Sequence, residues 1–455
     1  MRYTQRQYQF ATKGLGEYSC NNLFKGNHIF NISLLALSAI YLFVFGYNGL
    51  VLGLNVFSFT FFLYRLTLTL VGLRGDKDND KIISIESKDL PKYCILLPMR
   101  NEPIDVVKEL IKNMSLLNYP TDKLDIVMLV DLDDDNLKEI SSLNKPTHFR
   151  ILSSEASFPF TKPKVCNLGL ITTDAEFVTV YDAEDAPDSD QLLKVLYKFE
   201  DPNVACVQCR LHYNNRSPNW LAKFFNLEYL TWFSLTIVGL SKSQGEGAII
   251  PLGGTSQHLR VKELISMGGW DAMNVTEDCD LGVRLSRLGK TTVISDSWTN
   301  EIAVEKLKDF IPQRTRWQMG FMVTYLNHCK DIVGLVRSLG VYRFFHFIMS
   351  IFGNFINPII TPLLFIIFVR SYFFGYVGET FIDTLPMITL IGNYILIVAA
   401  HLIASAKFQG GKYWYMCFLQ PFYYLIQVIT VYRALYKLIT APYKWEKTTH
   451  CAEEK

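Results

Sequence analysis

Two clusters of reactive side chains lie in the second half of this 455-residue sequence. The first reads TEDCD at residues 276–280, where Thr276 is expected to cap a helix starting near Glu277. The second reads QRTRW at residues 313–317 and places a cation beside an indole. Transfer of a sugar from a nucleoside diphosphate to a hydroxyl needs a base, a positive charge for the leaving diphosphate and a flat apolar face for the acceptor. The two clusters contain all three.

An acidic loop, YDAEDAP at residues 181–187, follows a short apolar run. Because alternate residues of an extended chain point the same way, Asp182 and Glu184 can share one ligand. We expect that ligand to be Mg²⁺ or Mn²⁺ bridging the oxygens of a diphosphate. An acidic loop on its own is more often a solvated turn, so the other clusters strengthen this interpretation.

Three further polar clusters are candidates for ligand contacts. In residues 131–136 (DLDDDN) one or two carboxylates are expected to bind a uracil N–H or assist the metal, with the rest facing solvent. Residues 161–167 (TKPKVCN) offer a lysine for the donor phosphate at a helix N-terminus, the alternative being a surface charge. Residues 251–260 (PLGGTSQHLR) would let the backbone approach an acceptor sugar, or form an ordinary turn with a structural His258.

Composition points away from an ordinary soluble protein. The chain is 49% hydrophobic and 14% aromatic with only 19% charged residues. A formal net charge of +2 argues against nucleic acid as a partner. The nine cysteines form no framework, and the close pair Cys206 and Cys209 is interpreted as free thiols on a buried strand rather than a metal or redox site.

The elements that must position these clusters alternate between strand and helix. Residues 93–98, 124–130 and 177–181 are predicted strands, and residues 106–117 a predicted helix. This alternation predicts an α/β domain over residues 92–330 with an open, mainly parallel sheet. Ligands bind such sheets beyond the carboxyl ends of the strands, where the polar clusters fall.

Long apolar runs flank this domain on both sides. Residues 29–73 are predicted to form two transmembrane helices, preceded by a cytosolic segment at residues 1–28. Residues 344–440 contain three more apolar stretches, 344–369, 381–406 and 414–440, whose number of crossings the sequence leaves open. Basic residues beside the runs place the α/β domain in the cytosol.

Two aromatic segments within the α/β domain are predicted to lie at the membrane surface. Residues 219–240 are rich in aromatic side chains and poor in charge, which favours an interfacial helix over a core helix. Residues 312–327 form the second candidate, with Pro312 in its first turn.

Taken together, the motifs resemble the inverting family 2 glycosyltransferases, most closely the membrane-embedded branch that includes cellulose, hyaluronan, chitin and poly-N-acetylglucosamine synthases. The resemblance covers residues 92–330 by motif and the apolar runs by topology. The acceptor loop of that family is similar to residues 251–260, and its gating segment is weakly similar to residues 443–450 in the tail (441–455). The resemblance implies a GT-A fold embedded between N- and C-terminal transmembrane helices with amphipathic interface helices.

The resemblance also implies roles for individual residues. Asp278, beside Glu277, would be the general base. Asp182 and Glu184 would hold Mg²⁺ or Mn²⁺, with Asp185 able to share that role. Residues that would bind the donor are Asp131, Asp133, Lys164, Gln313 and Arg316. Residues that would contact the acceptor are Trp317, Gly254, Thr255 and Ser256.

Three functions then compete. The first is a plasma-membrane (bacterial inner-membrane) synthase that extends a β-linked polysaccharide from UDP-glucose or UDP-N-acetylglucosamine and translocates it, with a secretion partner or homo-oligomer left open. The second is a single-transfer enzyme with a lipid acceptor of ceramide or polyprenyl type, because some lipid glucosyltransferases share the Q-x-x-R-W ending. The third, a transporter, predicts polar residues in the spans. Few stand out, namely Arg65, Asn354, Asn393 and His401.

Overall fold

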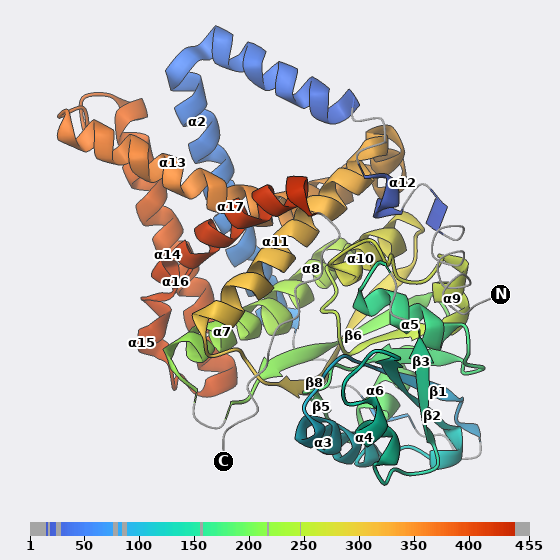
Figure 1. Cartoon of the computed structure of the whole chain (residues 1–455). Helices are drawn as coiled ribbons and strands as arrows, with labels where there is room; N and C mark the ends of the chain where they lie inside the picture. Colours follow the sequence, from blue (N-terminus) through green and yellow to red (C-terminus); the bar gives the residue numbers. More distant parts are fainter. Residues whose placement is uncertain are drawn as a thin grey trace.

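The computed structural model describes residues 15–16, 19–23, 29–75, 81–83, 89–154, 158–215, 218–245 and 247–441. Most of the predicted N-terminal segment 1–28 and the predicted gating segment at residues 443–450 lie outside these ranges. In Figure 1 a sheet with its covering helices forms one part of the molecule, and long helices extend from it as the other. This arrangement agrees with the predicted α/β domain between apolar helices.

One mixed, mainly parallel sheet forms the base of the α/β domain, in the order β3-β2-β1-β4-β7-β6-β8-β5. Strands β1 to β4 run parallel, as do β6 and β8, whereas β7 is antiparallel to both neighbours and β5 is antiparallel to β8. The predicted sheet type is therefore confirmed. The strands are β1 (Tyr93–Met99), β2 (Leu124–Asp131), β3 (Phe149–Ser154), β4 (Phe177–Val180), β5 (Ala186–Pro187), β6 (Val204–Tyr213), β7 (Gln257–Arg260) and β8 (Thr291–Glu301).

Short amphipathic helices cover this sheet. In α3 the buried residues are Val107, Leu110, Ile111 and Met114, a spacing that puts them on one helical face. The helix predicted at 106–117 thus exists but begins and ends two residues earlier. The helices of the domain are α3 (Ile104–Ser115), η4 (Thr121–Lys123), α4 (Leu137–Ser142), α5 (Lys162–Leu170), α6 (Gln191–Lys198), α9 (Val261–Ser266) and α10 (Glu277–Arg287).

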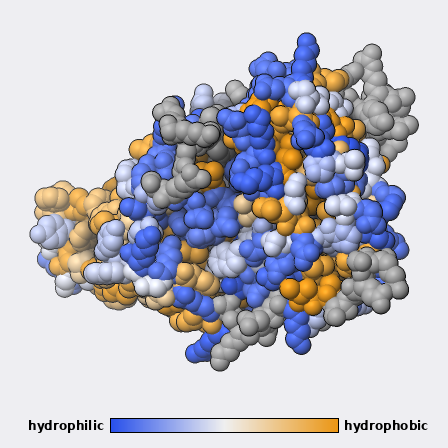
Figure 2. Space-filling model, turned by 90° about the horizontal axis from the view of Figure 1, so that it is seen from below, coloured by the Kyte–Doolittle hydropathy of each residue, from blue (hydrophilic) through white to orange (hydrophobic). Residues whose placement is uncertain are grey.

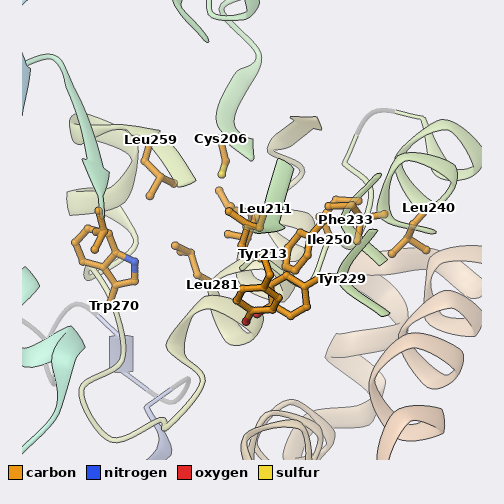
Figure 3. Packing of buried hydrophobic residues seen from close by; sticks show 14 of the residues in the cluster. Cys206, Leu211, Tyr213, Tyr229, Phe233, Leu240, Ile250, Leu259, Trp270 and Leu281 are labelled. Carbon is orange, nitrogen blue, oxygen red and sulfur yellow. The ribbon is translucent and has the colours of Figure 1, made fainter. Parts of the chain in front are cut away.

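The hydrophobic core continues from the sheet into a buried helix that follows β6. Tyr213 of β6 packs on Tyr229 with ring centroids 4.2 Å apart, and Figure 3 places Phe233 beside this pair. The helix consists of α7 (Trp220–Thr231), the π-helical turn η5 (Trp232–Thr236) and α8 (Ile237–Gln244). Most of its apolar side chains are buried, as the core-helix alternative for residues 219–240 expects.

A long helix, α2 (Ile29–Gly75), crosses this buried helix in close contact. It is interrupted at Gly46, where φ is 57°, between the two predicted spans. A Cβ on Gly72 would lie 2.0 Å from the Leu235 carbonyl oxygen, and one on Gly239 would lie 1.9 Å from the Leu68 carbonyl oxygen. Only glycine allows the two backbones to approach so closely, so these positions fix the crossing.

Among the residues that the structure describes, three helical segments are long and apolar enough to cross a membrane: Gly46–Arg74, Leu307–Phe373 and Phe381–Gln409. Figure 2 shows hydrophobic residues over the end of the molecule that contains α13 and α14, and mainly hydrophilic residues over the α/β domain. The helices here are α11 (Leu307–His328), η6 (Cys329–Asp331), α12 (Ile332–Phe347), η7 (Ile348–Phe352), α13 (Gly353–Phe373) and α14 (Phe381–Gln409). A short turn, η2 (Cys20–Asn22), precedes α2.

The last apolar stretch, residues 414–440, does not form one long helix. It is divided into α15 (Trp414–Cys417), α16 (Gln420–Tyr423) and α17 (Leu425–Thr440), and α17 packs along α11 in Figure 1. The predicted start of the second interface helix is also wrong. Helix α11 begins at Leu307, so Pro312 lies in the second turn and removes one backbone hydrogen bond there.

Candidate active site

A cavity of about 320 Å³ opens where β1, β2 and β4 end, and it extends to the long helices. Parallel strands present their carboxyl ends at one edge, which is why residues from distant parts of the sequence meet here. Eleven of the thirteen predicted site residues line the cavity: Asp131, Lys164, Asp182, Glu184, Gly254, Thr255, Glu277, Asp278, Gln313, Arg316 and Trp317. Asp133 and Ser256 do not.

The acidic pair Glu277 and Asp278 begins helix α10. Burial, followed by the charge of Asp278, raises the pKa of Glu277 to about 8. Burial also raises the pKa of Asp278, to about 6, but the Cys279 N–H and the charge of Lys162 hold it below that of its neighbour. The Cys279 N–H donates to Asp278 Oδ1 over 2.7 Å. Near neutral pH the pair therefore holds one proton on Glu277 and a negative charge on Asp278.

Thr276 precedes this pair at the N-cap position of α10 but does not cap the helix. Its side chain accepts no hydrogen bond from the first turn, and its hydroxyl instead lies 3.5 Å from Asn274 Oδ1. The predicted capping role is therefore wrong. Thr276 packs against Gly320 of α11, where a Cβ would lie 2.1 Å from its Oγ1, so it joins α10 to the helix of the second cluster.

Lys162, the first residue of α5, connects three of the predicted motifs. Its Nζ donates to Asp182 Oδ1 over 2.6 Å and to the Gly254 carbonyl over 2.8 Å. Burial alone would lower the pKa of Lys162, but the carboxylates of Asp182 and Glu277 outweigh burial and raise it. Sequence reasoning treated Lys162 as an alternative to Lys164 for the donor phosphate and did not place it among the carboxylates.

The predicted metal pair lies at the end of β4. Asp182 and Glu184 both line the cavity, whereas Asp185 is fully buried below them. Asp185 Oδ2 accepts from the Asp182 N–H over 2.7 Å and from the Thr255 hydroxyl, so this oxygen supports the loop.

The residues present fit a divalent cation that arrives with a diphosphate. Among the described residues no group of three or more His, Cys, Asp or Glu side chains could hold a metal alone. Magnesium is commonly held by one or two carboxylates together with substrate phosphates and water, which Asp182 and Glu184 match. The ammonium of Lys162 on Asp182 indicates that this position already attracts a cation.

The donor end of the cavity contains Asp131 and Lys164. Asp131 accepts from the Ser154 hydroxyl over 2.9 Å and from Arg100 Nη1 over 3.1 Å. Asp133 lies outside the cavity, 3.7 Å from Arg100 Nη2, with half of its side chain exposed. Burial lowers the pKa of Lys164, whose Nζ lies 5.9 Å from the centre of the Phe160 ring. The structure thus brings Asp131 and Lys164 into the site and leaves Asp133 at its rim.

The predicted acceptor loop approaches Asp278 through its backbone. Gly254 has a φ of 75°, and a Cβ there would lie 2.8 Å from Asp278 Oδ2. The buried Thr255 hydroxyl donates to Asp185 Oδ2 and lies 3.1 Å from the Val180 carbonyl oxygen. Ser256 is fully buried with its hydroxyl 2.5 Å from that of Thr299, so the predicted acceptor contact of Ser256 is wrong.

Helix α11 supplies the opposite wall with Gln313, Arg316 and Trp317. Arg316 Nη1 lies 3.5 Å from the Val275 carbonyl oxygen, beside the acidic pair. Trp317 is partly exposed to the cavity and stacks on Tyr229 with centroids 6.0 Å apart and planes 28° apart. The geometry therefore combines a carboxylate, several cations and an aromatic face in one cavity.

A buried ion pair behind this wall was missed by sequence reasoning. Arg314 donates two hydrogen bonds to Glu228 of α7, whose carboxylate also accepts from Tyr423 over 2.7 Å and Gln427 over 3.2 Å. The guanidinium lies 4.6 Å from the centre of the Trp317 ring. The partners are far apart in sequence, and the only local signal was the adjacency of Arg314 to the second cluster.

A mainly parallel sheet with carboxylates, cations and an exposed aromatic ring at its carboxyl edge is the arrangement expected of a glycosyltransferase. Two family descriptions match the sequence, "Glycosyl transferase family 2" over residues 94–253 and "Glycosyl transferase family group 2" over residues 177–400. The chain belongs to the family 2 glycosyltransferases.

Similar proteins fall in the same class. A probable glycosyltransferase YdaM of Bacillus subtilis is 26% identical over 62% of this chain and 67% of its own length. A beta-monoglucosyldiacylglycerol synthase of Nostoc is 28% identical over 59% of this chain and 57% of its own length. A probable glucomannan 4-beta-mannosyltransferase 4 of Oryza sativa is 23% identical over 62% of this chain and 52% of its own length. The chain thus spans about half to two thirds of the length of these relatives.

A solved structure confirms the fold. The mannosyltransferase PcManGT from Pyrobaculum calidifontis, in complex with GDP-Man and Mn²⁺, superposes with a TM-score of 0.52 at 15% identity, over 85% of this chain and 99% of that one. The α/β domain is therefore of the GT-A type.

Proposed function

We propose that this protein transfers a hexose, with inversion, from a nucleoside diphosphate sugar to a hydroxyl of an acceptor that reaches the cavity from the membrane. One observation carries the proposal: Asp278 lies beside the Gly254 backbone, near Lys162 and Arg316, in the cavity that also contains Asp131 and Lys164. An ionised carboxylate at the acceptor loop, with cations nearby, is what single-displacement transfer needs.

In this mechanism Asp278 takes the proton of the acceptor hydroxyl. The hydroxyl oxygen forms a bond to the anomeric carbon while the bond from that carbon to the diphosphate oxygen breaks. The electron pair of the broken bond stays with the nucleoside diphosphate, where Arg316 and Gln313 would stabilise the charge. Trp317 would stack on the acceptor ring, and Asp131 and Lys164 would bind the nucleotide.

Asp182 and Glu184 would hold Mg²⁺ or Mn²⁺ when the donor is bound. The ion would neutralise part of the diphosphate charge as it develops. The similar mannosyltransferase, which is in complex with GDP-Man and Mn²⁺, supports this assignment. Because Lys162 Nζ donates to Asp182 Oδ1, the ion would either displace this hydrogen bond or bind the other carboxylate oxygen of Asp182.

The acceptor proposed first is a growing β-linked polysaccharide, extended from UDP-glucose or UDP-N-acetylglucosamine. Beyond Trp317 the cavity is lined by side chains such as Gln318, Asn354 and Gln427, which suit sugar hydroxyls better than acyl chains. The glucomannan mannosyltransferases among the relatives fit this proposal. Such a synthase would lie in the plasma (bacterial inner) membrane with the α/β domain in the cytosol, and would pass its product between the long helices.

A single transfer to a membrane lipid is the second candidate. The relatives named as beta-monoglucosyldiacylglycerol synthases favour it. It predicts one sugar added to a lipid hydroxyl at the same cavity, with no polymer.

The test is nucleotide release by detergent-purified protein with UDP-glucose, UDP-N-acetylglucosamine and GDP-mannose, with Mn²⁺, Mg²⁺ or EDTA. Labelled product would be separated by gel and by organic extraction. Metal-dependent release with a high-molecular-weight product supports the synthase, and a short, extractable product supports the lipid enzyme. Release that persists in EDTA would contradict the role of Asp182 and Glu184.

A further inference from the structure

The cavity has a second end, formed by Arg65 of α2 and Trp232 of η5. The Arg65 guanidinium lies 4.5 Å from the centre of the Trp232 ring, and both residues line the cavity. Their position is fixed by the glycine-dependent crossing of α2, because Arg65 lies about one turn before Leu68 and Trp232 lies just before Leu235. Arg65 and Trp232 are therefore held in place as part of the cavity wall.

Within the described part of the chain, Arg65 is attracted by the carboxylate of Glu228 but forms no ion pair with it. Its guanidinium makes a ring contact with Trp232, and no hydrogen bond or ion pair of that group is found among the described residues. The nearby carboxylate of Glu228 is already bound by Arg314, Tyr423 and Gln427. Two guanidinium groups and one carboxylate leave this region with one positive charge.

Such a charge is costly where it lies. Arg65 belongs to the segment Gly46–Arg74, which is long and apolar enough to cross a membrane. An arginine in such a helix normally faces the interior and pairs with an anion, because an uncompensated charge in a medium of low dielectric is unfavourable. The planar, five-donor guanidinium suits a phosphate or carboxylate held by two parallel hydrogen bonds.

Arg65 also lies at a defined place relative to the acceptor. Trp232 follows Tyr229 by three residues in the same helix, and Tyr229 stacks on Trp317. Arg65 and Trp317 thus line the same cavity, and the residues they contact, Trp232 and Tyr229, are about one helical turn apart, roughly 5 Å.

We propose that Arg65 binds an oxyanion on the acceptor, next to the sugar or hydroxyl that reacts at Asp278. The oxyanion is either the phosphate of a membrane lipid or the carboxylate of an acidic sugar in a glycan. The inference rests on the proposed transfer at Asp278. It favours a lipid acceptor with a phosphate, or a polysaccharide that contains an acidic sugar, over a polymer of glucose or N-acetylglucosamine alone.

The experiment compares acceptors that differ in charge. Phosphatidylcholine vesicles carrying either phosphatidylglycerol or diacylglycerol supply an anionic and a neutral lipid hydroxyl. A hyaluronan tetrasaccharide and cellotetraose supply the matching glycans. Transfer of labelled sugar is measured with the wild-type protein, with Arg65→Gln and with Arg65→Lys. Arg370→Gln is the matched control, because Arg370 is also an arginine on a long helix stacked on a tyrosine, Tyr47 at 5.2 Å, but does not line the cavity.

We expect the anionic member of one pair to be preferred, and Arg65→Gln to raise the KM for that acceptor at least tenfold, with a smaller effect of Arg65→Lys. Whichever pair responds identifies the source of the oxyanion. Circular dichroism and thermal unfolding of Arg65→Gln are compared with those of the wild type, which shows whether the variant folds.

Two outcomes overturn the inference: equal use of anionic and neutral acceptors by the wild type, or an equal effect of Arg65→Gln and Arg370→Gln. Failure of the wild type to turn over any donor would instead refute the proposed function itself.

Discussion

The Nζ of Lys162 lies 2.6 Å from Asp182 Oδ1, so the first residue of α5 occupies one oxygen of the predicted metal pair. The same ammonium reaches the Gly254 carbonyl and lowers the pKa of Asp278. One lysine thus connects the carboxylates of the donor side with the acceptor loop and the proposed base.

Replacing Lys162 by methionine should separate metal affinity from turnover. Asp182 loses a competing cation, so half-maximal activity should need less Mn²⁺, whereas kcat should fall about 10- to 100-fold because Asp278 loses a positive neighbour. Mn²⁺ titration of nucleotide release measures both. Lys194→Met is the control, since Lys194 pairs only with Asp188 and Asp190 outside the cavity. A higher Mn²⁺ requirement in Lys162→Met would contradict the competition.

Activity should fall in acid with an apparent pKa near that of Asp278, about 6. A base works when deprotonated, and burial raises this pKa, so the loss should begin about two pH units above that of an ordinary aspartate. At pH 5 kcat should be about tenfold below its plateau. The profile of kcat from pH 5 to pH 8 tests this, and Asp278→Asn should lower the plateau kcat about 1,000-fold and remove the acid limb.

Glu277→Gln should stabilise the protein in alkaline solution. The folded-state pKa of Glu277 is about 8, raised from 4.5, so the folded protein retains a proton that the unfolded chain releases. The stability from this proton is complete below pH 4.5 and is lost as the pH rises to 8. At pH 9 Glu277→Gln should therefore gain about 1–3 kcal/mol over wild type, and at pH 4 nothing. Thermal unfolding at both pH values measures it; an equal gain at pH 4 would point to packing instead.

Gly254→Ala should abolish most activity without unfolding the chain. The new methyl group would lie 2.8 Å from Asp278 Oδ2 and displace that carboxylate. Gly289 provides the control, because it has a similar φ of 67° but nothing within 4 Å of an added Cβ. Both variants should lose about 1 kcal/mol of stability from backbone strain. Only Gly254→Ala should also lose kcat, by about tenfold or more; equal activities would refute the close approach.

Elements that carry their own local pattern were predictable from the sequence. Strands β1, β2 and β4 are apolar runs that end in polar clusters, so the strands themselves and the gathering of Asp131 and Asp182 at one edge followed from the rule for parallel sheets. The sequence also predicted that the carboxylates of Glu277 and Asp278 lie together in the site, because the two residues are adjacent in the sequence.

Features that depend on side-chain direction or distant partners were not predictable. Lys162 and Lys164 lie in one helical turn, and only the setting of α5 against the sheet directs Lys162 to Asp182 and Lys164 toward Phe160. Ser256 looked available beside two glycines, but a φ of 52° turns it into the core. The partners of Glu228 come from three helices far along the chain, which no local pattern reveals.

The hydrogen bonds to Glu228 determine which fragments and chimeras of this enzyme can fold. Helix α7 belongs to the α/β domain, yet the groups that neutralise its carboxylate come from α11, α16 and α17. A water-soluble fragment that ends after β8 would lack these groups. The buried carboxylate of Glu228 would then have none of the three hydrogen-bond partners that follow β8, and the wall formed by α11 would be missing. For the same reason, a chimera that borrows only α11 from a relative would break the ion pair. A chimera keeps these contacts only when Glu228 is exchanged together with Arg314, Tyr423 and Gln427, so the four residues form one unit for any exchange of the acceptor wall.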